Sequence, residues 1–196
     1  SKNQKFIAIN LAGVADNLLE GRIRGTSKGA FTGAEDKASW YEDAKGGVLF
    51  LDELQSASIE SQTQLLDLVN AVSDQVTVAR IGMESKDPPT FSVKVIFAIN
   101  EGLGELIENK KLRSDLFFRM RQVCHFRPLK ERLSDSKQNI LDLLLHMLAW
   151  KYAQSAPSEE YGPKKSLTIS FSPAAKSALK AHDWPGNLRE FERVIA

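Results

Sequence analysis

Short apolar runs alternate with stretches of helical spacing along the first two thirds of the chain. The runs predict strands at Phe6–Asn10, Val48–Leu51, Val93–Asn100 and Val123–Phe126, and weaker patterns at 76–81 and at the start of 92–100 indicate a further pair. Helical spacing falls between them at Val14–Glu20, Ile59–Val72, Gly104–Asn109 and Leu112–Met120. This alternation is typical of βαβ units. The sequence therefore predicts an α/β domain with a mainly parallel sheet flanked by helices.

Only helical patterns follow Pro128. A spacing of i, i+3, i+4, i+7 and i+8 predicts a long amphipathic helix, formed by Ile140, Leu143, Leu144, Met147 and Leu148. Ser172 before Pro173 predicts the start of a second helix, and Asn187 with Glu190 gives a capping-box-like start to a third. We therefore expect an α/β core over residues 1–134 and a small helical lid over residues 135–196.

Composition narrows the classes of function. Of the 196 residues, 42% are hydrophobic and 26% are charged, as in ordinary soluble domains, and the net charge is +1. Nucleic-acid binders usually carry a clear basic excess, so we expect DNA contact only through a separate domain. The single cysteine, Cys124, cannot form an internal disulfide, and no apolar stretch approaches the ~20 residues that span a bilayer. We expect a cytoplasmic protein without membrane contact.

Two adjacent acids, Asp52 and Glu53, close the apolar run that follows Gly46 and Gly47. Ligands of open α/β sheets bind at the carboxyl ends of the strands. An acid there can hold Mg²⁺, and a second acid can orient a water for attack on a phosphoryl group. The alternative is structural: Asp52 caps the following helix and Glu53 is solvated.

Asn10 and Asn100 end strand patterns at what should be the same edge of the sheet. A neutral amide there can hydrogen-bond a carboxylate or a γ-phosphate without adding charge. Asparagine also favours strand ends and turns for purely local reasons, so this alternative stays open for each residue.

A loop of six residues places an aromatic ring between two glycines, with no apolar periodicity around it. It consists of Gly29, Ala30, Phe31, Thr32, Gly33 and Ala34. A phenylalanine left in water forgoes roughly 1.5–3 kcal/mol of burial, so an exposed loop that displays one suits a contact role. Alternatively, Phe31 folds back onto a neighbouring helix.

The hexapeptide GAFTGA resembles the signature loop of the sigma-54-dependent transcriptional activators, which belong to the AAA+ ATPases. Gly46–Glu53 resembles their Walker B motif, and Asp183–Phe191 resembles their WPGNxREL tract. Leu112–Met120 resembles a segment whose two arginines act across the subunit interface, and 126–132 resembles the linker into the lid. These motifs stand in the family's order over essentially the whole chain.

The resemblance implies an AAA+ fold with a small C-terminal helical lid, and a domain that uses ATP and Mg²⁺. It assigns Asp52 to the metal and Glu53 to hydrolysis. It makes Asn10 a switch that pairs with Glu53 and Asn100 a sensor. Arg113 and Arg119 become fingers that act in trans, and Arg189 becomes a second sensor at the nucleotide. The alternatives that need no function are that Arg113 and Arg119 are solvated surface charges and that Arg189 forms a salt bridge with a carboxylate elsewhere on the protein.

The same resemblance implies partners. Homo-oligomers, in this family hexamers, hydrolyse ATP between subunits and use the Phe31 loops to remodel the closed complex of the sigma-54 RNA polymerase holoenzyme.

One expected part is missing from the sequence, because no G-x-x-x-x-G-K-[ST] tract occurs in it. The chain enters the Phe6–Asn10 strand pattern almost at once and stops inside a helical pattern. We therefore expect the Walker A segment to precede Phe6–Asn10 in the natural protein and this segment alone to hydrolyse ATP poorly or not at all. The rival hypothesis is a non-hydrolysing regulator on the same fold that acts by oligomerisation or partner binding. A Walker A lysine before Ser1 would favour the enzyme.

Overall fold

The structure, a computed structural model, describes residues 5–66, 69, 75–83, 87–120, 122–135, 139–155 and 171–195. The chain divides into two compact units, Ser1–Val123 and Cys124–Ala196. The division falls before α6 (Leu129–Ser134), so this helix belongs to the second unit, whereas the boundary expected from the sequence lies near residue 134.

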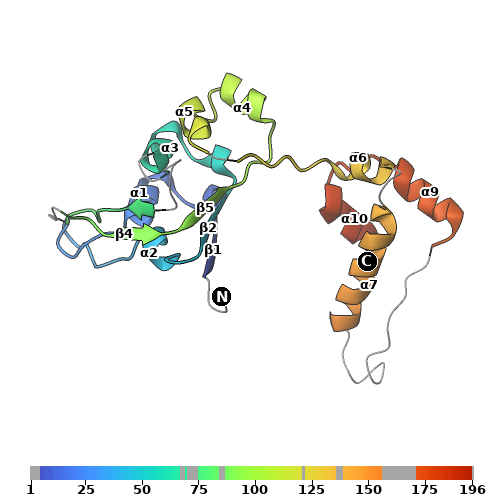
Figure 1. Ribbon diagram of the computed structural model, residues 1–196, viewed down its shortest axis with the longest axis horizontal. Helices are drawn as coiled ribbons and strands as arrows, with labels where there is room; N and C mark the ends of the chain where they lie inside the picture. Colours follow the sequence, from blue (N-terminus) through green and yellow to red (C-terminus); the bar gives the residue numbers. More distant parts are fainter. Residues whose placement is uncertain are drawn as a thin grey trace. The chain divides into compact units, whose positions relative to one another are not determined.

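The first unit is built on a parallel sheet of three strands in the order β1-β2-β5 (Figure 1). These strands are β1 (Phe6–Asn10), β2 (Val48–Asp52) and β5 (Lys94–Phe97). Its helices are α1 (Asp16–Arg24), α2 (Trp40–Asp43), α3 (Ile59–Leu66), α4 (Leu103–Glu108) and α5 (Ser114–Phe118), with short 3-10 helices η1 (Leu11–Gly13) and η2 (Leu54–Ser56). The α/β architecture predicted from the alternating pattern is therefore confirmed.

The two faces of this sheet differ because successive side chains of a strand point to opposite sides. On one side, Leu49 and Leu51 of β2 are fully buried, and α1 and α3 contact each other within the same core. On the other side, Phe6 and Ile96 are exposed. Asn10 and Asp52 are register partners, so both lie on this second, more open face at the carboxyl end of the sheet.

Not every strand prediction is correct. The expected strand Val123–Phe126 is wrong, because residues 122–128 have no regular structure. Val123 is 62% exposed and Phe126 is 87% exposed. A strand needs a neighbour to pair its backbone groups, and among the described residues this segment has none. The weaker pair is present with other bounds than expected, as the antiparallel strands β3 (Gln75–Thr77) and β4 (Thr90–Ser92).

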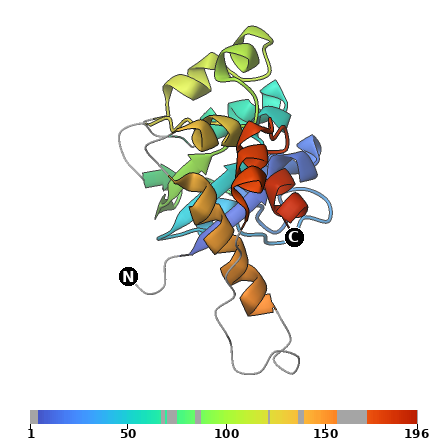
Figure 2. The same ribbon diagram turned by 90° about the vertical axis from the view of Figure 1, so that its right-hand side faces the viewer.

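The expected helix Ile59–Val72 is confirmed as far as Leu66, and Leu65 and Leu66 are buried as predicted. Val69 packs against the core, whereas Val72 lies outside the described residues. Helices α4 and α5 lie beyond the carboxyl ends of the strands (Figures 1 and 2). They therefore border the edge of the sheet at which Asn10 and Asp52 lie.

The second unit contains α6, α7 (Ile140–Ser155), α9 (Pro173–Ala181) and α10 (Asn187–Ile195). Its core is formed by Leu129, Leu133, Ile140, Leu141, Leu145, Leu148, Trp184 and Phe191. Ser172 caps α9 as predicted, because its hydroxyl accepts a hydrogen bond from the Ala175 amide.

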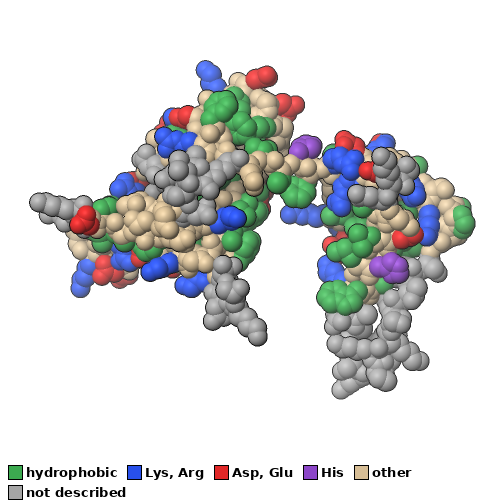
Figure 3. Space-filling view, in the orientation of Figure 1, with side chains coloured by type: hydrophobic (Ala, Val, Ile, Leu, Met, Phe, Trp, Pro, Cys, Tyr) green, Lys and Arg blue, Asp and Glu red, His purple; other side chains and the backbone are tan. Residues whose placement is uncertain are grey.

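Helix α7 is apolar nearly all round, and its buried side agrees with the predicted stripe in part. Ile140 and Leu148 are buried as predicted and Leu144 packs against the core, whereas Leu143 and Met147 are exposed; Leu141 and Leu145 are buried as well. Apolar side chains gather over this helix in the space-filling view (Figure 3). Helical spacing alone identified the buried side only in part, because apolar residues occur on both sides of the helix.

Candidate functional site

The carboxyl ends of β1 and β2 bring an amide and two acids together. Asn10 and Asp52 occupy paired positions on neighbouring strands, which lie ~4.8 Å apart in a sheet. Glu53 follows directly. Strand β5 ends at the same edge. The amide of Leu54, two residues after β2, donates a hydrogen bond to the carbonyl of Ala98, the residue directly after β5, at 3.0 Å. The prediction that the acids and the strand-end asparagines share one edge is confirmed.

Both acids are half-buried. One carboxylate oxygen of Asp52 accepts a hydrogen bond from the Glu53 amide at 3.0 Å, so Asp52 braces the turn and does not cap a helix. Glu53 has a φ of 55°, in the left-handed region, which costs a non-glycine residue roughly 1–2 kcal/mol. Its carboxylate has no hydrogen-bond or ion-pair partner within the described part of the chain. Backbone strain at an unpartnered acid is typical of a functional position.

The two asparagines are held by different contacts. The side-chain oxygen of Asn10 accepts from the Ala12 amide at 2.9 Å and caps η1, so its local role is present. The side-chain oxygen of Asn100 accepts from Nε2 of Gln55 at 2.5 Å. Because Gln55 occupies the side-chain oxygen of Asn100, the side-chain nitrogen of this exposed residue stays available as a hydrogen-bond donor. Gln55 was not predicted as a site residue, because nothing in its local sequence pattern indicates a partner 45 positions along the chain.

Arg113 and Arg119 both contact α3. The guanidinium of Arg113 makes two hydrogen bonds to Asp115, at 2.8 and 3.0 Å, and one to the Thr63 hydroxyl at 3.0 Å. The same contact with Arg113 lowers the pKa of Asp115. Nη1 of Arg119 donates to the Leu66 carbonyl at 2.5 Å. Neither arginine is a freely solvated charge, and α3 fixes the direction of both.

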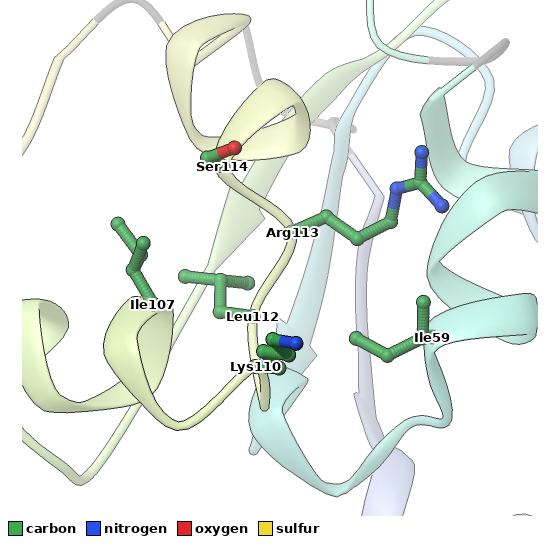
Figure 4. Close-up of a pocket in the computed structure, with 6 residues that line it drawn as sticks. All are labelled: Ile59, Ile107, Lys110, Leu112, Arg113 and Ser114. Carbon is green, nitrogen blue, oxygen red and sulfur yellow. The ribbon is translucent and has the colours of Figure 1, made fainter.

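A pocket of about 330 Å³ opens beside Arg113 (Figure 4). It is lined by Ile59, Ile107, Lys110, Leu112, Arg113 and Ser114. This pocket is not at the strand-end acids. The close-up shows the Arg113 side chain extending from the α4–α5 connection toward α3.

The GAFTGA loop is displayed at the end of a pinned base. Thr26 and Lys37 exchange two backbone hydrogen bonds of 2.9 Å, and the Ser27 amide donates to the Ile81 carbonyl at 3.0 Å. Beyond this base, Phe31 is 58% exposed, so its ring is not packed on a helix as the alternative required.

An ionic cluster fixes the same base to α2. The guanidinium of Arg80 makes two hydrogen bonds to the Glu42 carboxylate, at 2.8 and 2.5 Å, and lies 4.0 Å from Asp36. Asp36 in turn accepts from the Lys28 amide at 2.9 Å. Arg80 lowers the pKa of Glu42, and the base of the loop is therefore held by charge as well as by backbone contacts.

Within the second unit, Arg189 lies near the start of α10. It is exposed and forms no ion pair with any described residue, so the salt-bridge alternative is not observed. The predicted capping arrangement differs in detail. Asn187 accepts from the Leu129 amide at 2.8 Å, while the Glu190 carboxylate accepts from the Gly186 amide at 2.8 Å.

Among the described residues, no group of three or more His, Cys, Asp and Glu side chains could hold a metal ion. No helix in this part of the chain is long and apolar enough to cross a membrane.

The parallel sheet with strand-end acids and a helical second unit defines an AAA+ type of α/β protein. Known structures agree with this class. NtrX from Brucella abortus, crystallised with ADP, aligns over 96% of this chain and 38% of its own with a TM-score of 0.67 and 26% identity. Hsp104 in a closed state aligns over 97% of this chain and 34% of its own with a TM-score of 0.65 at 15% identity, which shows the fold alone.

The sequence comparisons specify the family. The model of the Sigma-54 interaction domain matches residues 1–125, and the chain belongs to this family. The sigma54-dependent transcriptional regulator SfnR of Pseudomonas fluorescens is 36% identical over 99% of this chain and 48% of its own length. NtrC of Bradyrhizobium is 36% identical over 98% of this chain and 36% of its own. The chain is thus a sigma-54 activation domain of the NtrC-like type, and it spans half or less of these relatives.

Proposed function

We propose that this domain hydrolyses ATP in an oligomer and uses the cycle to move the Phe31 loop against sigma-54. The observation that carries the proposal is the convergence of Asn10, Asp52 and Glu53 at one edge of the parallel sheet. The geometry suits phosphoryl transfer to water, since an acid at a strand end can serve a metal and its neighbour can orient the nucleophile.

The residues present fit a magnesium nucleotide in part. Mg²⁺ keeps several waters and is usually held by one or two carboxylates together with substrate phosphates, so the single acid Asp52 is a sufficient protein ligand. Mg²⁺ when bound would neutralise charge on the phosphates. Glu53 would accept the proton of the attacking water, and its freedom from other partners leaves it available for this role.

The remaining assignments follow the family and stay proposals. Asn10 is the switch that pairs with Glu53, and Asn100 reports the γ-phosphate through the amide nitrogen that Gln55 leaves free. Arg113 and Arg119 serve the site of a neighbouring protomer, and Arg189 contacts the nucleotide. A guanidinium stabilises the spread charge of a transferring phosphoryl group better than an ammonium does. NtrX was also crystallised with ATP, which supports nucleotide binding by this fold.

Sigma-54 is the proposed partner of the GAFTGA loop. The exposed Phe31 ring supplies apolar contact area, and the base pinned by Arg80 and Thr26 gives that ring a defined starting position. Relatives of this chain carry names of sigma54-dependent regulators, which supports the assignment. DNA binding belongs to another domain in this proposal.

The test replaces Glu53 by alanine in the longest native chain that contains this domain. We expect Glu53→Ala to lower ATP turnover at least a hundredfold while nucleotide binding is retained, because the substitution removes the proton acceptor and no binding contact. Glu60→Ala is the matched control, since Glu60 is an exposed acid at the start of α3. Turnover retained in Glu53→Ala would refute the assignment.

A further inference from the structure

Gln62 is a polar residue in the middle of the core-facing side of α3. It is 0% exposed. Its side-chain nitrogen donates to the Ala57 carbonyl at 3.0 Å and to the Lys111 carbonyl at 2.8 Å, and its oxygen accepts from the Arg113 amide at 3.0 Å. Burying an amide is costly unless it is hydrogen-bonded, and here both hydrogens and the oxygen have partners. An apolar side chain could fill this buried position without the cost of desolvating an amide. The three hydrogen bonds of Gln62 therefore call for an explanation beyond packing.

The partners of Gln62 join two segments that lie far apart in the sequence. Ala57 follows η2, the tight turn that begins directly after Glu53. Within that turn the Ser56 amide donates to the Glu53 carbonyl at 2.9 Å, so Glu53 and Ala57 are joined by a short, hydrogen-bonded path. Lys111 and Arg113 lie in the connection between α4 and α5. Gln62 therefore ties the acid end of β2 to the backbone of Arg113.

The next residue of α3 holds the other end of the same arginine. The Thr63 hydroxyl accepts from Nη1 of Arg113, and Asp115 holds the guanidinium from the opposite side. Figure 4 shows the side chain extended toward α3. Two successive side chains of one helix thus fix Arg113, one at its backbone and one at its charged group.

We propose that Gln62 and Thr63 are positioning residues that set the direction of Arg113 and link it to the Glu53 turn of the same protomer. The inference rests on the proposed function, in which Arg113 acts on a neighbour's nucleotide. A shift of the Glu53 turn moves Ala57, and the Gln62 amide transmits that shift to Arg113. The state of one site is thereby communicated to the next site around the oligomer.

The test uses mixed oligomers, because a defect in Arg113 affects only the neighbouring protomer. Wild-type protein is mixed with a fourfold excess of Glu53→Ala, which lacks the proton acceptor but keeps the backbone carbonyl that bonds the Ser56 amide, and so keeps the path to Arg113. Parallel mixtures contain Glu53→Ala combined with Gln62→Met, with Thr63→Val or with Arg113→Ala. Gln64→Met in the Glu53→Ala background is the matched control, since Gln64 lies on the same helix and makes no described contact with Arg113. ATP turnover per wild-type protomer, nucleotide affinity and the fraction incorporated are measured.

At this ratio about one protomer in five is wild-type, so about one wild-type site in five receives its arginine from a wild-type neighbour. A variant that misplaces Arg113 should therefore lower turnover per wild-type protomer up to about fivefold below that of the Glu53→Ala mixture. We expect this loss with Gln62→Met and a smaller loss with Thr63→Val. Gln64→Met should match Glu53→Ala alone, and nucleotide affinity should not change. If the variant with Gln62→Met does not assemble, the turnover of the Thr63→Val mixture relative to the Glu53→Ala mixture decides the test.

The inference is overturned if the Gln62→Met and Thr63→Val mixtures match Glu53→Ala alone while the Arg113→Ala mixture falls. If the Arg113→Ala mixture also matches, the trans role of Arg113 in the proposed function fails, and the inference fails with it.

Discussion

Replacing Gly25 by alanine tests how firmly the base of the GAFTGA loop is fixed. Gly25 ends α1 with φ 77° and ψ 170°, a conformation that is open almost only to glycine. A Cβ atom placed there would lie 2.6 Å from the Lys37 carbonyl oxygen and 2.8 Å from the Ser39 amide nitrogen. Both are backbone atoms, so no side chain can rotate away.

Two costs add in this variant. The backbone conformation costs an alanine about 1–3 kcal/mol. Overlap with fixed backbone adds about 1–3 kcal/mol, as in other overpacked sites. We therefore expect Gly25→Ala to lower the free energy of unfolding by roughly 2–6 kcal/mol, which for a unit of this size lowers Tm by roughly 8–20 °C. Calorimetry or circular dichroism measures the transition.

Two other glycines provide graded controls. Gly33 has a φ of 83° but no heavy atom within 4 Å of an added Cβ, so Gly33→Ala should cost about 1 kcal/mol from conformation alone. Gly13 has neither a positive φ nor a close neighbour, and Gly13→Ala should be neutral or stabilising by up to about 1 kcal/mol. A Gly25→Ala protein that melts at the same temperature as Gly33→Ala would refute the reasoning.

Two further predictions concern the first unit. Leu51 is 0% exposed in the central strand, so Leu51→Ala should cost about 2–5 kcal/mol in urea unfolding, and a cost below about 1 kcal/mol would contradict the described core. Arg80 lowers the pKa of Glu42 from its ordinary 4.5, so the ion pair stabilises the fold above that pH and its contribution is lost as pH falls through the lowered value. Glu42→Gln should therefore cost about 1–3 kcal/mol at pH 7 and less at pH values below 4.5, and an equal cost at both would count against the pair.

The sequence predicted the part of the site that depends on strand pattern. Apolar runs that end in Asn10 and Asp52 imply parallel strands, and parallel strands bring their carboxyl ends to one edge. The register that pairs these two residues does not follow from topology alone and is a result of the structure. The exposure of Phe31 was likewise predictable, since two glycines and no apolar periodicity surround it.

Contacts between distant segments were not predictable in the same way. Gln62 lies 51 positions from Arg113, and a glutamine on a helix is usually expected on its solvent side. The Val123–Phe126 pattern favours a strand, but β propensity carries no information on whether a neighbouring strand is present. For α7, apolar residues on both sides of the helix made the buried face only partly predictable: Ile140 and Leu148 are buried as expected, whereas Met147 is exposed.

The central claim is that nucleotide chemistry at Asp52 and Glu53 controls the contact made by the Phe31 loop. The most direct measurement is the affinity of sigma-54 for the native protein, with and without a nucleotide analogue of the phosphoryl-transfer transition state. We predict that the analogue promotes binding of the wild-type protein and that Phe31→Ala abolishes this gain while analogue binding is unchanged. Equal sigma-54 affinity for both proteins in the presence of the analogue would contradict the account.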